Sequence, residues 1–165
     1  DLQNIKKLIS FEQKTNKSKV VHTVDSWINF TNDAICKLSI SKYKIGNRNN
    51  LNIEIYGDKG SLLWNHENPE ILIYYNQKGK KFNLDRNDDE LKFSKSSYLN
   101  RYTVGHPYGF IEAMANYYYK IFNSINKKKN NKIFNPVSIY DEIKIFKLIT
   151  KLKKSSQNNR WIDFK

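Results

Sequence analysis

The sequence predicts an α+β fold, a mostly antiparallel, open-faced β-sheet with helices packed on one face. Two observations lead to this prediction. Residues 24–84 contain short apolar segments rich in strand-forming residues, separated by turns of Gly, Asn and Asp. Residues 110–152 contain two long stretches with apolar residues at helical spacing. Strands that precede helices, rather than alternating with them, are typical of an antiparallel sheet covered on one side.

The first segment, residues 2–9, is predicted to form a short helix, because Leu2, Ile5 and Leu8 fall on one helical side. Residues 24–41 then have the pattern of a β-hairpin. Its turn is the cluster TND at residues 31–33, and residues 34–41 alternate with a period of two.

Further strands are expected over residues 51–57, 61–64, 70–75 and 81–84. Gly57 and Gly60 bound a tight turn between the first two, and we expect both to need a positive φ, which glycine tolerates. Residues 85–97 are polar and are expected to form a surface loop.

Two helices close the predicted fold. The first carries an apolar stripe of Phe110, Met114, Tyr117, Ile121 and Ile125. The second is expected to begin at Ser138, with Asp141 completing a capping box, and to carry the stripe Ile139, Ile143, Phe146, Ile149 and Leu152. The segment RWIDF, residues 160–164, is predicted to be a last strand.

Composition excludes several classes of protein. The length of 165 residues indicates one domain, and the chain has no apolar run long enough to span a membrane. One cysteine excludes a disulfide framework and a cysteine-based zinc site, which favours the reducing cytoplasm. The net charge of +13 comes mainly from scattered lysines, with only four arginines. We interpret it as a solvated basic surface, not a nucleic-acid site.

The chain lacks the common signatures of a self-sufficient enzyme. It contains no G-x-G-x-x-G and no phosphate-binding G-x-x-x-x-G-K-[ST] segment. Its three histidines lie far apart without metal-ligand spacing, and Cys36 falls inside an alternating strand, where packing explains it. The residues therefore predict no catalytic, cofactor-binding or metal-binding site within this chain.

Three stretches, in order, resemble the Gfo/Idh/MocA family of sugar and inositol oxidoreductases. Residues 47–64, NRNNLNIEIYGDKGSLLW, are similar to a strand–turn–strand segment of the family. Residues 105–119, GHPYGFIEAMANYYY, resemble its G-H-P-x-G-[FY]-x-E-A-x-A-N segment, with Tyr108 where Glu is common. Residues 158–164, NNRWIDF, are similar to its usual terminus.

The resemblance covers only the C-terminal domain of that family. It implies that residues 1–165 form a single substrate-binding and oligomerisation domain, and that the N-terminal Rossmann cofactor domain is absent from this chain. Asp1 would match the final Asp of the family's D-x-x-x-H-x-x-D pattern, so the catalytic Lys, Asp and His would lie upstream. The full-length enzyme would bind NAD or NADP, whereas this chain alone would bind neither.

The resemblance thus implies an NAD(P)-dependent oxidoreductase acting on a sugar or polyol, and it suggests the substrate contacts. The loop bearing Asn47, Arg48 and Asn49 offers amide and guanidinium groups suited to hydroxyl-rich ligands, although a solvated turn explains it as well. Asp1 joins this set by its family position. Two functions stay open at this point: the domain of an active enzyme, or a non-catalytic remnant serving as an assembly or binding module.

His106 and Tyr108 are the remaining candidate contacts. Pro107 suits the first turn of a helix, so His106 is expected at or near the N-cap, after a sharp bend at Gly105. It is either only that bend or, in addition, a hydrogen-bonding partner for a sugar hydroxyl.

The apolar sheet face away from the helices is expected to pair with another subunit, as a homodimer or homotetramer.

Overall fold

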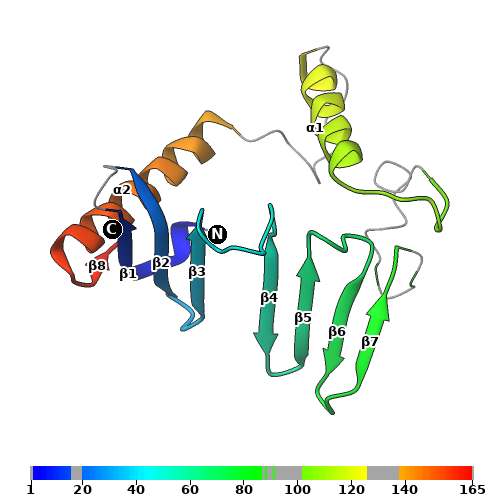
Figure 1. Ribbon diagram of the computed structural model, residues 1–165, viewed down its shortest axis with the longest axis horizontal. Coiled ribbons are helices and arrows are strands. Elements are labelled where there is room, and N and C mark those ends of the chain that lie inside the picture. Colours follow the sequence, from blue (N-terminus) through cyan, green and yellow to red (C-terminus); the bar gives the residue numbers. More distant parts are fainter. Residues whose placement is uncertain are drawn as a thin grey trace. The chain divides into compact units, whose positions relative to one another are not determined.

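A computed structural model describes residues 2–15, 20–86, 88, 91, 102–125 and 138–164. The chain divides into two compact units, one made of Asp1–Gly46 with Val137–Lys165, and the other of Asn47–Pro136. Figure 1 shows the elements of both units, and each unit is described by itself below.

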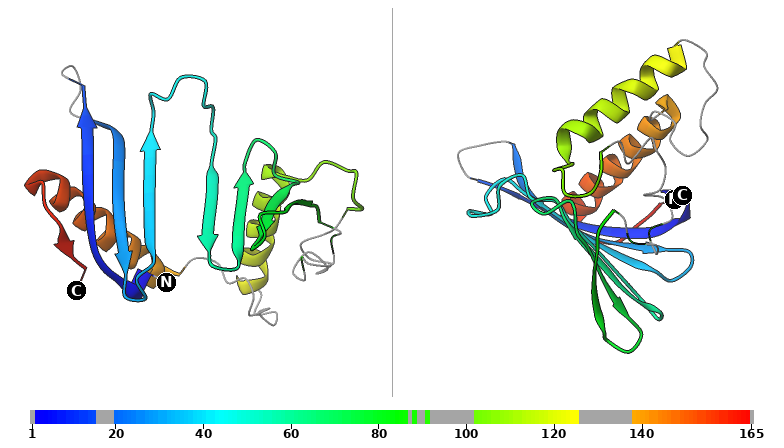
Figure 2. Two further views of the ribbon diagram at one scale, coloured as in Figure 1. Left: turned by 90° about the horizontal axis from the view of Figure 1, so that it is seen from below. Right: turned by 90° about the vertical axis from the view of Figure 1, so that its right-hand side faces the viewer.

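The first unit is an antiparallel sheet with one helix. Its strands lie in the order β3-β2-β1-β8, with β1 at Ile5–Lys14, β2 at Val21–Phe30, β3 at Ile35–Ser41 and β8 at Ile162–Asp163. Helix α2, Ile139–Asn158, lies against one face of this sheet (Figure 2). The buried core between them comprises Ile5, Leu8, Ile28, Leu152, Ile162 and Phe164.

The predicted helix over residues 2–9 is wrong. A single 3-10 turn spans Leu2–Asn4, and β1 begins at Ile5. Leu8 pairs with Ile28 of β2 on one side and with Ile162 of β8 on the other, so its strand is a central one. The periodicity of so short an apolar run does not distinguish a helix from a strand. An isolated helix of this length is only marginally stable, whereas the strand is stabilised by hydrogen bonds to its two neighbouring strands.

The predicted hairpin, capping box and last strand of this unit are confirmed. The hairpin turns at residues 31–33, where Asp33 has a φ of 62° and Phe30 N–H donates to the Ala34 carbonyl over 2.9 Å. Ser138 and Asp141 form the capping box of α2. The last strand is present as β8.

The predicted apolar stripe of α2 is wrong as its packing side, because Leu148, Leu152 and Ser155 face the sheet, whereas Ile139, Ile143, Phe146 and Ile149 are exposed.

Serine hydroxyls join α2 to the sheet. The Ser155 Oγ accepts from the buried Ser10 N–H over 3.0 Å and donates to the Arg160 carbonyl over 2.7 Å. Beside it, Ser156 Oγ accepts from Glu12 N–H over 2.8 Å. In the described residues β8 pairs with Lys7 and Leu8, so these hydroxyls satisfy N–H groups of β1 that lie past Ile162, the first residue of β8.

The second unit holds the other sheet and helix α1, Phe110–Ile125. Its four antiparallel strands lie in sequence order, with β4 at Asn52–Gly57, β5 at Gly60–Asn65, β6 at Leu72–Asn76 and β7 at Lys81–Leu84. These match the predicted strands closely. The predicted loop over residues 85–97 falls mostly outside the described residues.

The tight turn between β4 and β5 differs from its prediction at one glycine. Gly60 has a φ of +147°, whereas Gly57 is not among the residues with positive φ. The two glycines pair with each other at the end of the ladder. Only Gly60 therefore depends on the conformational freedom of glycine, because Gly57 keeps ordinary strand geometry.

The predicted fold class is confirmed, since among the described residues the antiparallel strands β1 to β7 precede two long helices in the chain and β8 follows them. The described strands form two four-stranded sheets. Among the described residues, no helix is long and apolar enough to cross a membrane.

Candidate functional site

Loops gather at one end of the second sheet. Asn52 pairs with Asn65, and Leu72 pairs with Leu84. This antiparallel pairing places the start of β4, the end of β5, the start of β6 and the end of β7 at the same end of the sheet, which we call the loop-bearing edge. The Asn65 Nδ2 donates to Asn52 Oδ1 over 2.6 Å and fixes the two strand ends together. Residues 47–51, 66–71 and 85–86 therefore share this edge.

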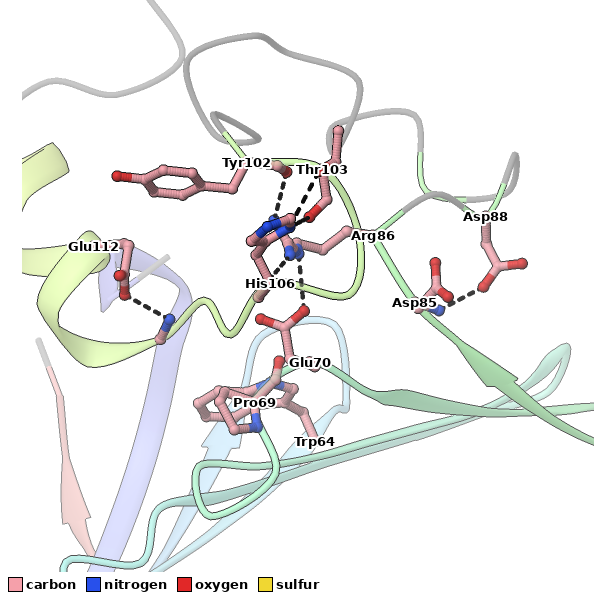
Figure 3. Close-up of polar contacts among 11 residues, drawn as sticks. Trp64, Pro69, Glu70, Asp85, Arg86, Asp88, Tyr102, Thr103, His106 and Glu112 are labelled. Carbon is pink, nitrogen blue, oxygen red and sulfur yellow. Dashed lines mark hydrogen bonds and ion pairs between the residues drawn. The ribbon is translucent and has the colours of Figure 1, made fainter.

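Arg86 is the central side chain at this edge. Its Nε donates to Glu70 Oε2 over 2.9 Å, its Nη1 to the Tyr102 carbonyl over 3.2 Å, and its Nη2 to the His106 carbonyl over 3.0 Å. Figure 3 shows the guanidinium between Glu70 and the 102–106 segment. The arginine thus joins the β5–β6 connection to the bend that precedes α1.

His106 lies in that bend with one ring nitrogen engaged. Its Nδ1 is 3.2 Å from the Thr103 carbonyl oxygen and 3.1 Å from the Thr103 hydroxyl. A carbonyl oxygen only accepts, so this contact is a hydrogen bond in the tautomer that carries its proton on Nδ1, and that tautomer has a lone pair on Nε2. The side chain is exposed, and Nε2 has no hydrogen-bond partner in the described part of the chain.

Tyr108 is half-buried beside His106. The Arg86 guanidinium carbon lies 4.8 Å from the centroid of the Tyr108 ring, and Tyr102 meets the same ring edge-on with centroids 6.2 Å apart. The buried Asn116 amide donates to the Tyr108 hydroxyl over 3.1 Å. The phenol is therefore held in place, while its hydroxyl hydrogen stays available to donate.

Helix α1 starts later than the sequence predicts. It begins at Phe110, so the prediction that His106 lies at or near the N-cap is wrong. Gly109 occupies the cap position, because its carbonyl accepts from Ala113 N–H over 3.0 Å. The Tyr108 ring stacks against the Arg86 guanidinium. This tertiary contact holds Tyr108 outside the helix, so the helix starts after Gly109 and not at Pro107.

A carboxylate occupies the start of α1. Glu112 Oε2 accepts from Gly109 N–H over 2.8 Å, and this hydrogen bond is the main reason that the pKa of Glu112 lies below its usual value. The Glu112 backbone N–H and the charge of Arg86 lower the pKa further. The Glu112 carboxylate thus neutralises the partial positive charge at the N-terminus of α1.

The predicted loop contacts Asn47, Arg48 and Asn49 all lie exposed at the same edge of the sheet. The neighbouring Asn50, which sequence reasoning did not single out, has a buried Oδ1 without a hydrogen-bond partner in the described residues. A buried amide oxygen of this kind calls for a donor. The remaining predicted contact, Asp1, lies outside the described residues.

Neither described helix start offers the free N–H groups that a dinucleotide needs. Dinucleotide pyrophosphates bind free N–H groups at a helix start. Here Glu112 occupies the start of α1, and the capping box of Ser138 and Asp141 occupies that of α2. Across the described ranges, no group of three or more His, Cys, Asp or Glu side chains is placed to hold a metal ion.

Sequence reasoning missed Arg86, Glu70 and Thr103, which hold the bend in shape. One signal in the sequence points to Arg86, since it is one of four arginines among 29 basic residues. In a chain that otherwise uses lysine, an arginine indicates a position that needs a planar, forked donor. Glu70 and Thr103 carry no comparable signal, because their roles arise from contacts between distant loops.

Residues 8–164 match the family described as the oxidoreductase family, C-terminal alpha/beta domain, GFO_IDH_MocA_C. The chain therefore belongs to this family, the C-terminal domain of Gfo/Idh/MocA oxidoreductases. No curated protein matches the chain in sequence.

Several solved structures share the fold. An oxidoreductase from Sinorhizobium meliloti aligns with a TM-score of 0.86 and 23% identity, covering 96% of this chain and 46% of that one. An inositol dehydrogenase homolog from Azotobacter vinelandii, complexed with NADH and myo-inositol, aligns with a TM-score of 0.85 and 20% identity, covering 97% and 44%. A levoglucosan dehydrogenase complexed with NADH and L-sorbose aligns with a TM-score of 0.73 and 15% identity, covering 98% and 45%.

At these identities the likeness establishes the fold. The chain spans less than half the length of each of these solved relatives. Two of them are complexes with NADH and a polyol or sugar, and those ligands belong to the relatives.

Proposed function

We propose that this chain is the substrate-binding and oligomerisation domain of an NAD(P)-dependent oxidoreductase that transfers a hydride between a sugar or polyol carbon and nicotinamide. The observation that carries the proposal is the exposed His106 ring, whose Nδ1 lies at hydrogen-bonding distance from Thr103, in the bend that Arg86 ties to the loop-bearing edge of the second sheet. Family membership and the polyol-bound and sugar-bound relatives support it.

The chemistry of these side chains suits a hydroxyl-rich ligand. The His106 Nε2 accepts a hydrogen bond from a substrate hydroxyl, and the Tyr108 hydroxyl donates one to a ring or hydroxyl oxygen. Asn47, Arg48 and Asn49 add exposed amide and guanidinium groups. This domain then binds and orients the substrate, whereas the catalytic Lys, Asp and His and the NAD or NADP site belong to the cofactor domain.

Changing His106 to Asn in the full-length oxidoreductase tests the proposal. Asn is shorter and cannot place an acceptor where Nε2 lies, so we expect kcat/KM to fall about ten- to a hundredfold, the range for losing a substrate hydrogen bond. His22→Asn is the matched control, because His22 lies on β2 in the other unit, where it contacts Thr15 and Tyr43. Activity of His106→Asn within about twofold of wild type would contradict the proposed contact between His106 and the substrate.

A non-catalytic assembly module is the second candidate function. It is favoured by the apolar side chains exposed on the first sheet, on the face away from α2: Phe11, Trp27 and Ile35. The coding DNA upstream of the Asp1 codon separates the two candidates. An open frame that encodes a Rossmann domain with a Gly-rich turn supports the enzyme, whereas a closed frame supports the assembly module. With either function, the single cysteine fits a cytoplasmic location.

A further inference from the structure

The side chain that links the most segments at the candidate site is Arg86, and neither its role nor that of Glu70 follows from the sequence motifs. Arg86 leaves 13% of its side chain exposed, although it lies at a loop-bearing edge. Each of its three nitrogens donates a hydrogen bond, to Glu70, Tyr102 and His106 respectively. A guanidinium so engaged has little left to offer a substrate directly.

These contacts define the shape of the bend. Arg86 holds the carbonyl groups of Tyr102 and His106, which lie at the two ends of a short turn containing Gly105, whose φ is +93°. The turn is closed by His106 N–H donating to the Thr103 carbonyl over 3.3 Å. With both ends clamped, Thr103 is presented to the His106 ring at hydrogen-bonding distance.

We infer that Arg86, oriented by Glu70, is a positioning residue that sets the ring orientation and tautomer of His106 and the placement of the Tyr108 phenol. It does so through its bonds to the bend carbonyls and through its stacking on Tyr108. The role of His106 as a substrate contact rests on the proposed function. The effect of Arg86 on the orientation of the His106 ring does not depend on that function.

The geometry of arginine is what this position needs. A planar fork donates in several fixed directions and stacks on an aromatic ring at the same time, whereas a lysine ammonium is a point charge on a flexible stem. Glu70 accepts the hydrogen bond from Nε, so Nη1 and Nη2 are directed at the carbonyl groups of the bend. Arg86→Lys keeps the charge and removes the fork.

The first measurement is nitrogen NMR on the 165-residue chain with labelled histidine. In wild type we expect His106 to show a protonated Nδ1 and an unprotonated Nε2. In Arg86→Lys the Nε2 resonance should move toward the protonated position, because the Thr103 carbonyl is no longer held against Nδ1. Arg160→Lys, on an exposed arginine of the other unit, should leave the His106 resonances in place.

The second measurement is kinetic and uses the full-length oxidoreductase. We expect Arg86→Lys to lower kcat/KM about ten- to a hundredfold, mainly through a higher KM, as misplacement of binding groups does. If Arg86→Lys does not fold, Glu70→Gln replaces it, with a smaller change in the same direction in both measurements. A wild-type His106 spectrum in the folded variant overturns the inference.

The two proposals fail separately. If Arg86→Lys changes the His106 resonances but His106→Asn leaves activity unchanged, Arg86 does position the ring and the proposed substrate contact by His106 is wrong. If His106→Asn lowers activity while Arg86→Lys alters neither spectrum nor kinetics, the proposed function stands and the positioning role is wrong.

Discussion

Gly60 is the residue at which the backbone leaves no room for a side chain. A Cβ at Gly60 would collide with the carbonyl oxygen of Tyr75 in β6 and would lie 2.9 Å from Cε2 of Tyr74. Its φ of +147° adds backbone strain for any other residue. At Gly57, in contrast, the nearest atom to a new Cβ is the Gly60 carbonyl oxygen, at 3.7 Å, an ordinary contact.

We therefore predict that Gly60→Ala lowers the free energy of unfolding by about 1–3 kcal/mol, because the β5–β6 pairing must open to admit the methyl group. Gly57→Ala serves as the control, and its change should stay within about 0.5 kcal/mol. Urea unfolding followed by circular dichroism measures both. Equal losses in the two variants would contradict this description of the turn.

At the scale of elements, Ser155 joins α2 to β1. Its Oγ accepts from the N–H of Ser10, and both residues are fully buried. Removing the hydroxyl leaves a buried N–H without its acceptor, so Ser155→Ala should lower the free energy of unfolding by about 1–3 kcal/mol. Ser156→Ala should cost less, because Ser156 and Glu12 are only half-buried and water can replace the hydroxyl. Thermal unfolding of both variants ranks the two losses, and the reverse order would contradict the prediction.

The capping box of α2 makes a pH-dependent contribution. The Ser138 hydroxyl, and then its backbone N–H, donate to Asp141 and hold the pKa of that carboxyl below its usual value. A pKa lowered on folding stabilises the protein above the pKa of the unfolded chain, about 4. That stability is lost as the pH falls through the lower, folded pKa.

Asp141→Asn should therefore lower the melting temperature at neutral pH, and the gap to wild type should narrow as the pH falls below about 4. Calorimetry across this range measures the gap. Glu142→Gln is the control, since it removes a charge from the same helical turn without a side-chain contact to Ser138. A gap that stays constant with pH would show that the carboxylate charge does not contribute.

At the scale of the whole molecule, we predict that the face of the first sheet away from α2 pairs with a second copy of the chain. Phe11, Trp27 and Ile35 point away from the α2 side, with 48%, 44% and 63% of their surface exposed. Apolar groups gathered on one face favour association. We predict a dimer or tetramer in light scattering, and Trp27→Glu should shift it toward monomer without loss of secondary structure. Gln157→Glu, at an exposed position of α2, should not. Wild-type monomer over a wide concentration range would contradict the prediction.

We also predict that the 165-residue chain by itself binds neither NAD nor NADP. The starts of both described helices are occupied by carboxylates of Glu112 and Asp141, which repel a pyrophosphate. Isothermal titration calorimetry measures this directly. Micromolar binding would overturn both this prediction and the assignment of the cofactor site to another domain.

Some features of this protein were determined by sequence alone. Strand alternation, glycine turns and the Ser138–Asp141 capping box depend on neighbours within a few residues, so their patterns predict structure directly. The three family segments likewise identified the family, because each is a local string of residues.

Only the tertiary structure decided the features that depend on distant partners. The segment at Ile5–Lys14 is a strand because β2 and β8 flank it, although its local apolar spacing also suits a helix. The start of α1 moves to Phe110 because Tyr108 packs on Arg86. The candidate site itself depends on Arg86 meeting Glu70 and the 102–106 bend. These contacts join Arg86 to residues that are 16 to 22 positions away in the sequence. The propensities of neighbouring residues do not encode contacts of this kind.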